Sequence, residues 1–268
     1  MPRVTAFLDQ CKNEKTTRAY RGAVRDLFES EFGEARNLDQ QAEEYFSPDR
    51  DYEEGVKRFL QSIDELAPKT VRLKISAVKM FLIENDVELG QKFWRRLKRK
   101  IKGSRALTID KVPSNEEIKK IVLHLPIHAK ALVLTLASSG MRIGEASQIK
   151  LDDIDLDARP VRTQLRGKYT KSGNPRHAFI SKETGDMIRE WLKVRDNYIE
   201  TAVATSNFPK EADDNRLFPF HPSISYIMWR GALDKARMAE RDKSTNYRRV
   251  NPHVLRKFFR TRLCMHAG

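Results

Sequence analysis

The sequence has 268 residues, of which 40% are hydrophobic and 33% charged, and its formal net charge is +14. This length suits two domains, and this composition is typical of soluble globular proteins and excludes fibrous and disordered chains. Because no apolar run is long enough to cross a bilayer and the first residues lack the apolar run of a signal peptide, we expect a cytoplasmic, intracellular protein without a membrane partner.

The positive charge is concentrated in the second part of the chain. Residues 1–102 contain 21 Lys and Arg against 18 Asp and Glu, a net of +3, whereas residues 103–268 contain 30 against 19, a net of +11. A strongly basic protein favours a polyanionic partner, nucleic acid before membrane. We therefore expect residues 103–268 to make the main contacts with phosphate groups.

Residues 1–102 have the apolar spacing of a helical domain. Stripes of apolar residues lie within 19–32, 56–63 and 71–82, and Gly33 is placed to end the first of these helices. A fourth stripe belongs to a helix whose other faces are strongly basic. We expect this helix to contact DNA through Lys92, Arg95, Arg96 and Arg99; a merely solvated basic face is the alternative.

A linker over residues 103–112 leads to a second domain, which we place at residues 113–268. Ser114 and Glu117 have the spacing of a capping box at its first helix. An apolar helix over 129–139 is interrupted by Gly140, and the periodicity then changes to that of two short strands, 161–166 and 176–180, joined by a turn at 171–175. Helices resume around Ile188 and Ile224, with a polar loop over 200–216 between them.

The last predicted helix begins near Asn251, which can cap it, with Pro252 in its first turn. His253 and Arg256 are three residues apart, so we expect them on one face of this helix. The apolar residues Leu255, Phe258 and Phe259 would form its buried side.

Three basic positions stand out as candidate site residues. Arg142 follows a buried helix and a glycine, where burial requires a charge partner, and Glu145 lies one turn away. Lys171 lies at the tip of the predicted hairpin, and His253 stands beside Arg256. Each has a simpler explanation on its own: a structural Arg–Glu pair, a solvated loop lysine and an incidental histidine.

Together these residues suit the chemistry of a phosphodiester. Two arginines can hold the non-bridging oxygens of one phosphate by forked, charge-assisted hydrogen bonds. A histidine can donate to the same oxygens or move a proton, and a lysine on a flexible turn can protonate a leaving oxygen. The set stabilises negative charge without a metal ion.

The same segments, in this order, resemble the catalytic domain of the tyrosine recombinases, the lambda-integrase and Xer family. The resemblance covers residues 114–268 and rests on Ser139-Gly140-Met141-Arg142-Ile143-Gly144-Glu145, on Lys171-Ser172-Gly173-Asn174-Pro175-Arg176 and on His253-Val254-Leu255-Arg256. It implies a mainly α fold: a helical, SAM-like core-binding domain and an α-rich catalytic domain with a small antiparallel sheet. Thr17 and Tyr20 are similar to residues in the first helix of the family's core-binding domain.

The resemblance also implies roles for these residues. Arg142 and Arg256 would clamp the scissile phosphate, His253 would assist proton transfer, Lys171 would protonate the departing 5′ oxygen, and Glu145 would hold Arg142. The partner would be double-stranded DNA, bound by a homotetramer in the full-length form, with no cofactor and no metal ion. Further DNA contacts are expected from Lys168, Arg176 and Lys257.

One family residue is missing. In the family a tyrosine follows the second arginine and forms a 3′-phosphotyrosine link, whereas all seven tyrosines of this sequence precede His253. We therefore interpret the chain as a C-terminally truncated recombinase that binds DNA without cleaving it and is monomeric. The alternatives are a non-catalytic integrase relic or recombination regulator, a relative of the type IB topoisomerases, and an RNA-binding protein.

No metal site is expected. Residues 153–157 alternate Asp with apolar residues like the start of an EF-hand loop, but Ala158 stands where the loop requires glycine and Gln164 where it requires glutamate. We interpret this segment as a polar edge strand. The two cysteines have no partner spacing for zinc or a disulfide framework.

Overall fold

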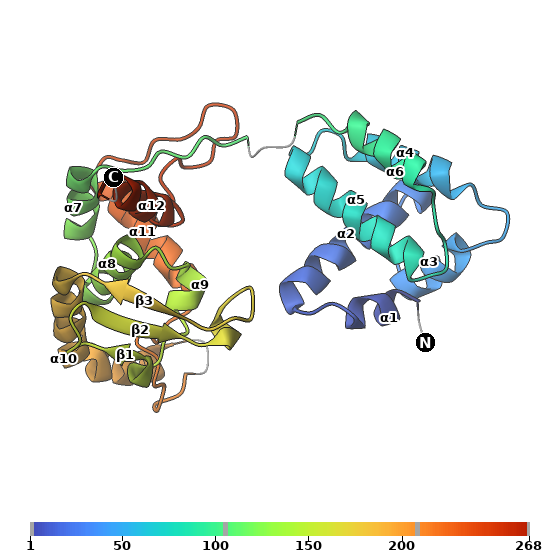
Figure 1. The fold of residues 1–268 in the computed structure, drawn as a ribbon. Helices are drawn as coiled ribbons and strands as arrows, with labels where there is room; N and C mark the ends of the chain where they lie inside the picture. Colours follow the sequence, from blue (N-terminus) through green and yellow to red (C-terminus); the bar gives the residue numbers. More distant parts are fainter. Residues whose placement is uncertain (1–2, 104–106, 207–209, 267–268) are drawn as a thin grey trace. The chain divides into compact units, whose positions relative to one another are not determined.

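Helices dominate residues 3–103, 107–206 and 210–266, which the computed structural model describes. The chain divides by its internal contacts into two units, residues 1–107 and 108–268, each with its own hydrophobic core. Figure 1 shows helices in the first unit, and helices around a small sheet in the second. The predicted fold class, mainly α with a small antiparallel sheet, is confirmed.

The first unit consists of α1 (Arg3–Asp9), α2 (Glu14–Phe32), α3 (Leu38–Tyr45), α4 (Tyr52–Ser62), α5 (Pro68–Ile83) and α6 (Gln91–Lys100). The apolar stripes seen in the sequence form its core, where Leu27, Phe28 and Phe59 are fully buried. Gly33 ends α2 with φ +80°, as its position predicts. Pro68, which ends the preceding apolar pattern, is the first residue of α5.

The second unit is built around α8. Its helices are α7 (Asn115–Leu123), α8 (Ile127–Ser139), α9 (Ile143–Ala146), α10 (Lys182–Thr205), α11 (Pro222–Lys235) and α12 (Val254–His266). Helix α8 is apolar on all sides and packs against α10, α12 and the sheet. Trp191 and Trp229 are buried in this core, and Trp94 in that of the first unit, as the sequence predicts.

The sheet is antiparallel, in the order β1 (Ile154–Asp155), β2 (Val161–Leu165) and β3 (Arg176–Ile180). Strands β2 and β3 form the predicted hairpin, with Leu165 opposite Arg176 at the end next to the turn. The Asp-rich segment around Ile154 is an edge strand, as interpreted from its sequence. Short 3-10 helices, η1 (Leu151–Asp153) and η2 (Gly167–Tyr169), precede β1 and the turn.

Three sequence-based boundaries differ from the structure. Residues 200–205 continue α10 instead of starting a loop, because Ile199 is still buried and the helix keeps an apolar face to that point; the predicted loop also includes residues 207–209, outside the described residues. Helix α12 begins at Val254, three residues after Asn251. Residues 108–112 belong by their contacts to the second unit, although the sequence assigns them to the linker, of which 104–106 lie outside the described residues.

Candidate active site

The first element of the site is the turn that follows α8. Gly140 ends the helix with φ +63°, a conformation that favours glycine, and Arg142 then stands in extended backbone just before α9. Both the backbone N–H and the side chain of Arg142 turn to Glu145: the amide donates to Oε2 at 2.8 Å and Nη1 donates to Oε1 at 3.0 Å. The turn therefore fixes the arginine at backbone and guanidinium alike.

Glu145 is the buried centre of the site. Its side chain is 2% exposed, and Arg176 of β3 donates to Oε2 at 2.6 Å in addition to the two bonds from Arg142. A buried carboxylate is costly unless it is paired and fully hydrogen-bonded, and here three donors satisfy it. Glu145 thus brings together α9 and the strand that follows the hairpin turn.

Arg176, expected as a DNA contact, is part of this ion-pair cluster. Alternation along β3 places it on the same sheet face as the buried Ala178 and Ile180. That period-two pattern in the sequence predicts an inward arginine, a signal that the sequence analysis did not use. The side chain remains 39% exposed, so its outer face is open to solvent.

Arg256 enters the site from α12. Its Nη1 donates to the carbonyl oxygen of Gly140 at 2.8 Å, which attaches it to the turn that carries Arg142. Burial lowers the pKa of Arg256 from its ordinary value, and the positive charges of Arg142, Arg176 and Arg260 lower it further while Glu145 opposes them. The two predicted clamp arginines are thus close enough to repel one another.

The cluster has an excess of positive charge. Arg142, Arg176 and Arg256 carry three positive charges, and Glu145 carries the one negative charge among them. An unbalanced positive charge held in fixed geometry is the arrangement that stabilises charge developing on a phosphoryl group.

His253 and Lys171, the other two predicted catalytic residues, lie at the periphery. His253 is exposed and lies one turn before Arg256. Its backbone amide donates to Asn251 Oδ1 at 3.0 Å, so the predicted capping residue makes its bond in the turn before the helix. Lys171 is exposed in the turn between η2 and β3. Within the described part of the chain, neither side chain forms a hydrogen bond or ion pair with the arginine cluster.

Asp153, which is not among the site residues predicted from the sequence, anchors the base of the Lys171 turn. Its buried carboxylate accepts hydrogen bonds from Arg166 Nε at 2.5 Å, from the Tyr169 hydroxyl at 3.0 Å and from the Lys150 amide at 2.9 Å. The turn is also closed tightly, since a Cβ on Gly167 would lie 2.3 Å from the carbonyl oxygen of Gly173. The exposed Lys171 side chain is therefore carried by a turn whose backbone is held in place by Asp153.

The remaining predicted DNA contacts of the second unit differ in availability. Lys168 is exposed, with its ammonium 5.6 Å from the centre of the Tyr169 ring. Lys257 instead forms an ion pair with Asp110, with 2.5 Å between Nζ and Oδ2. The positive charge of Lys257 is therefore partly neutralised by Asp110.

The basic side chains of α6 are exposed and are not paired with acidic side chains among the described residues. The helix buries Phe93, Trp94 and Leu97, and all of its basic residues are exposed. Among the residues that the structure describes, none of these basic side chains forms an ion pair or hydrogen bond: Lys92, Arg95, Arg96, Lys98, Arg99 and Lys100. The helix ends at Lys100, so Lys102 lies beyond its end.

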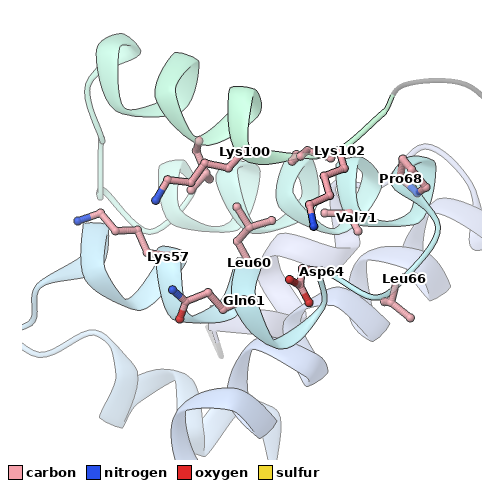
Figure 2. Close-up of a pocket in the computed structure, with 11 residues that line it drawn as sticks. Lys57, Leu60, Gln61, Asp64, Leu66, Pro68, Val71, Lys100 and Lys102 are labelled. Carbon is pink, nitrogen blue, oxygen red and sulfur yellow. The ribbon is translucent and has the colours of Figure 1, made fainter.

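A cavity of about 230 Å³ lies beside the end of α6, among residues of α4, α5 and α6. Figure 2 shows Leu60 pointing into it, with Lys57, Lys100 and Lys102 around its margin and Asp64 across from Lys102. The floor is apolar and the margin predominantly basic. The lysines at its margin therefore add positive charge near the C-terminal end of α6.

Within the described ranges, no group of three or more His, Cys, Asp or Glu side chains is arranged to hold a metal ion. No described helix is both long and apolar enough to cross a membrane.

Comparison with known proteins gives the same fold in solved structures. A Tn1549 transposon integrase in complex with transposon right end DNA is 15% identical, with 100% of this chain and 88% of that chain covered and a TM-score of 0.65. A lambda integrase tetramer bound to a Holliday junction is 12% identical (99% and 73% covered, TM-score 0.59). XerH recombinase bound to its difH substrate is 15% identical (99% and 85% covered, TM-score 0.58).

The search of curated proteins gave no match. The model of the phage integrase family matches residues 111–267, more than half of the sequence and the whole arginine cluster. The chain therefore belongs to the phage integrase family and is, by family, a tyrosine-type site-specific recombinase.

Proposed function

We propose that this chain binds duplex DNA and holds a scissile phosphodiester between Arg142 and Arg256 for metal-free strand transfer. The observation that carries the proposal is the pairing of Arg142 and Arg176 with one buried carboxylate, beside Arg256 bonded to the Gly140 carbonyl, which leaves positive charge free for a phosphate. The solved relatives are integrases and recombinases in complex with DNA, which supports the same partner here.

The other residues take the roles that the family resemblance implies. His253, exposed beside Arg256, assists proton transfer at the phosphate, and Lys171 protonates the departing 5′ oxygen from the turn anchored by Asp153. Glu145 holds Arg142. The cations of α6, together with Lys168, bind the DNA backbone outside the reacting phosphate.

The covalent step needs a tyrosine, and residues 1–268 offer no suitable one. The Tyr169 hydroxyl donates to Asp153, and the Tyr198 ring packs against Trp191. Tyr226 and Tyr247 are exposed but precede the His253 turn. We propose that these residues by themselves bind and position the phosphate without forming a phosphotyrosine link, and that residues 1–268 by themselves are monomeric.

A binding titration tests the phosphate clamp. We expect binding to a labelled 30-bp duplex, followed by fluorescence anisotropy, to weaken steeply with salt, with a slope of about −0.9 per phosphate neutralised. Arg142→Gln and Arg256→Gln should each weaken binding more than Lys193→Gln, an exposed cation of the same unit that pairs with Glu190. Equal effects of all three variants would reject the clamp.

Denaturing gels separate recombinase chemistry from binding alone. After incubation with nicked duplex and four-way junction DNA, we expect this chain to give no covalent protein–DNA adduct. An adduct that disappears in Tyr226→Phe or Tyr247→Phe would contradict the proposed absence of a nucleophile.

A further inference from the structure

The segment through which the chain enters the second unit, residues 108–111, is bonded along its length to the loop that precedes α12. The amide of Ile109 donates to Asp242 Oδ2 at 3.0 Å, and its carbonyl oxygen accepts from Arg249 Nε at 3.1 Å. The Lys111 amide donates to the Arg249 carbonyl oxygen at 2.9 Å. Figure 1 shows the two traces side by side above α12. Both neighbours of Asp110 are therefore fixed.

The fixed Asp110 is bonded on both sides of the segment from His253 to Arg256. Its Oδ1 accepts from Asn251 Nδ2 at 3.0 Å, and its Oδ2 accepts from Lys257 Nζ at 2.5 Å. One partner stands two residues before His253, and the other directly follows Arg256. A single carboxylate thus bridges the two ends of the segment that carries these candidate site residues.

The bond to Asn251 also sets the orientation of that amide. Because Asn251 Nδ2 points to Asp110, its Oδ1 is left to accept from the His253 amide at 3.0 Å. An Asn side chain that accepts from the backbone N–H two residues further on forms an Asx turn, which here fixes the turn that leads into α12. The hydrogen bonds run from Asp110 through Asn251 to the backbone of His253.

We propose that Asp110 is a positioning residue for the phosphate site, holding the turn that leads into α12 and the first turn of the helix so that His253 and Arg256 face the scissile phosphate. This rests on the proposed function for the phosphate, whereas the hold on α12 is a property of the free protein. An exposed ion pair with Lys257 alone would contribute little, and the bond to Asn251 is the part that fixes the turn. The predicted DNA contact of Lys257 stays a prediction beside this ion pair.

Amide hydrogen exchange of the free protein, measured by NMR, tests the hold on α12. Asp110→Ala removes both acceptors and should speed exchange at the His253 amide about tenfold, the loss of roughly one net hydrogen bond. Asp110→Asn keeps an oxygen for Asn251 and loses the charge that Lys257 needs, so protection should stay within about twofold of wild type. Asp157→Asn, which breaks the ion pair with Arg189 elsewhere in the unit, is the matched control.

Either of two exchange results overturns the proposal. One is an unchanged His253 rate in Asp110→Ala. The other is an equal acceleration in Asp157→Asn, which would mean general destabilisation. If Asp110→Ala does not fold, the pair Lys257→Met and Asn251→Ala decides: Asn251→Ala should expose the His253 amide and Lys257→Met should not.

A double-mutant cycle on DNA affinity tests whether Asp110 acts through Arg256. Removing a carboxylate from a DNA-binding protein strengthens binding on Coulombic grounds, so weaker binding of a duplex by Asp110→Ala has the opposite sign. We expect about threefold weaker binding in the wild-type background and no weakening in Arg256→Gln. Tighter binding in both backgrounds contradicts a positioning role. No effect of Arg256→Gln itself rejects the proposed function and leaves the exchange measurement to decide on Asp110.

Discussion

Arg256 and Gly140 join two parts of the site that are 116 residues apart, through the hydrogen bond of 2.8 Å from Nη1 to the glycine carbonyl oxygen. The acceptor is at the end of α8, where backbone carbonyls lack helical partners and a cation is favourable. The same glycine is in contact with α12 through Phe259. Gly140 therefore both ends α8 and accepts the hydrogen bond that holds Arg256.

Gly140→Ala should destabilise the second unit by about 2–4 kcal/mol, because the new Cβ combines left-handed backbone strain with overpacking. Gly140 has φ +63°, and its Cβ would lie 2.3 Å from the Phe259 ring. Urea unfolding measures the change. Gly144→Ala is the control: a Cβ there meets nothing within 4 Å, so its stability should match or exceed wild type. Equal destabilisation of both variants would refute the packing argument.

Glu145→Gln should lower the stability of the second unit. The variant places an amide –NH2 against Arg142 and Arg176, which now pair with the carboxylate. Because both guanidiniums keep access to water, we expect a loss of about 1–3 kcal/mol, below that for a fully buried pair. Glu190→Gln, which breaks the exposed pair with Lys193, should change stability by less than about 0.5 kcal/mol. Stability of Glu145→Gln equal to wild type would contradict the buried-anchor role.

The cations of α6 predict a change in salt dependence. Replacing Arg95, Arg96 and Arg99 by Gln should weaken duplex binding and reduce the slope of log K against log salt by about 0.9 for each phosphate that the helix no longer neutralises. The matched control replaces three ion-paired cations of the same unit, Arg18, Arg25 and Lys57. An equal change of slope in the two triple variants would identify the α6 cations as a solvated face.

Asp153 predicts a pH dependence of stability. Burial raises the pKa of its carboxyl, but hydrogen bonds from the Lys150 amide, Arg166 and Tyr169 outweigh this and hold the pKa below its ordinary value of 3.8. The stabilisation is therefore complete above pH 3.8 and is lost as the pH falls through the lower, folded-state value. Asp153→Asn should cost about 1–3 kcal/mol in urea unfolding at pH 7, with a smaller difference from wild type at pH 3. A difference that is constant with pH would exclude the charged form as its source.

Sequence alone predicts the helices and the hairpin well because their apolar spacing is local. The capping box of Ser114 with Glu117 forms, and Gly33 ends α2 with positive φ. The pairing of Arg142 with Glu145 is also local, one helical turn apart, and it is present at 3.0 Å. The catalytic roles of Arg142, Lys171, His253 and Arg256 stay predictions until the variants are measured.

Contacts between distant segments could not be predicted in the same way. The anchoring of Asp153 by Arg166, and the partnership of Asp110 with Asn251, depend on how the chain folds back and leave no periodic pattern. Residues 108–112 read as a linker because a short polar segment looks the same whether it is solvated or bonded to a loop. Arg176 was accessible to prediction, through alternation with Ala178.

The connections that assemble the site are long in sequence: Glu145 to Arg176 spans 31 residues, Gly140 to Arg256 spans 116, and Asp110 to Lys257 spans 147. Contacts of this kind form late in folding, since a large loop must close before they are made. We therefore expect phosphate affinity to appear last during refolding, after most of the helical circular dichroism signal. During synthesis the three arginines can meet only after α12 has emerged from the ribosome, so the proposed phosphate clamp cannot form before that point.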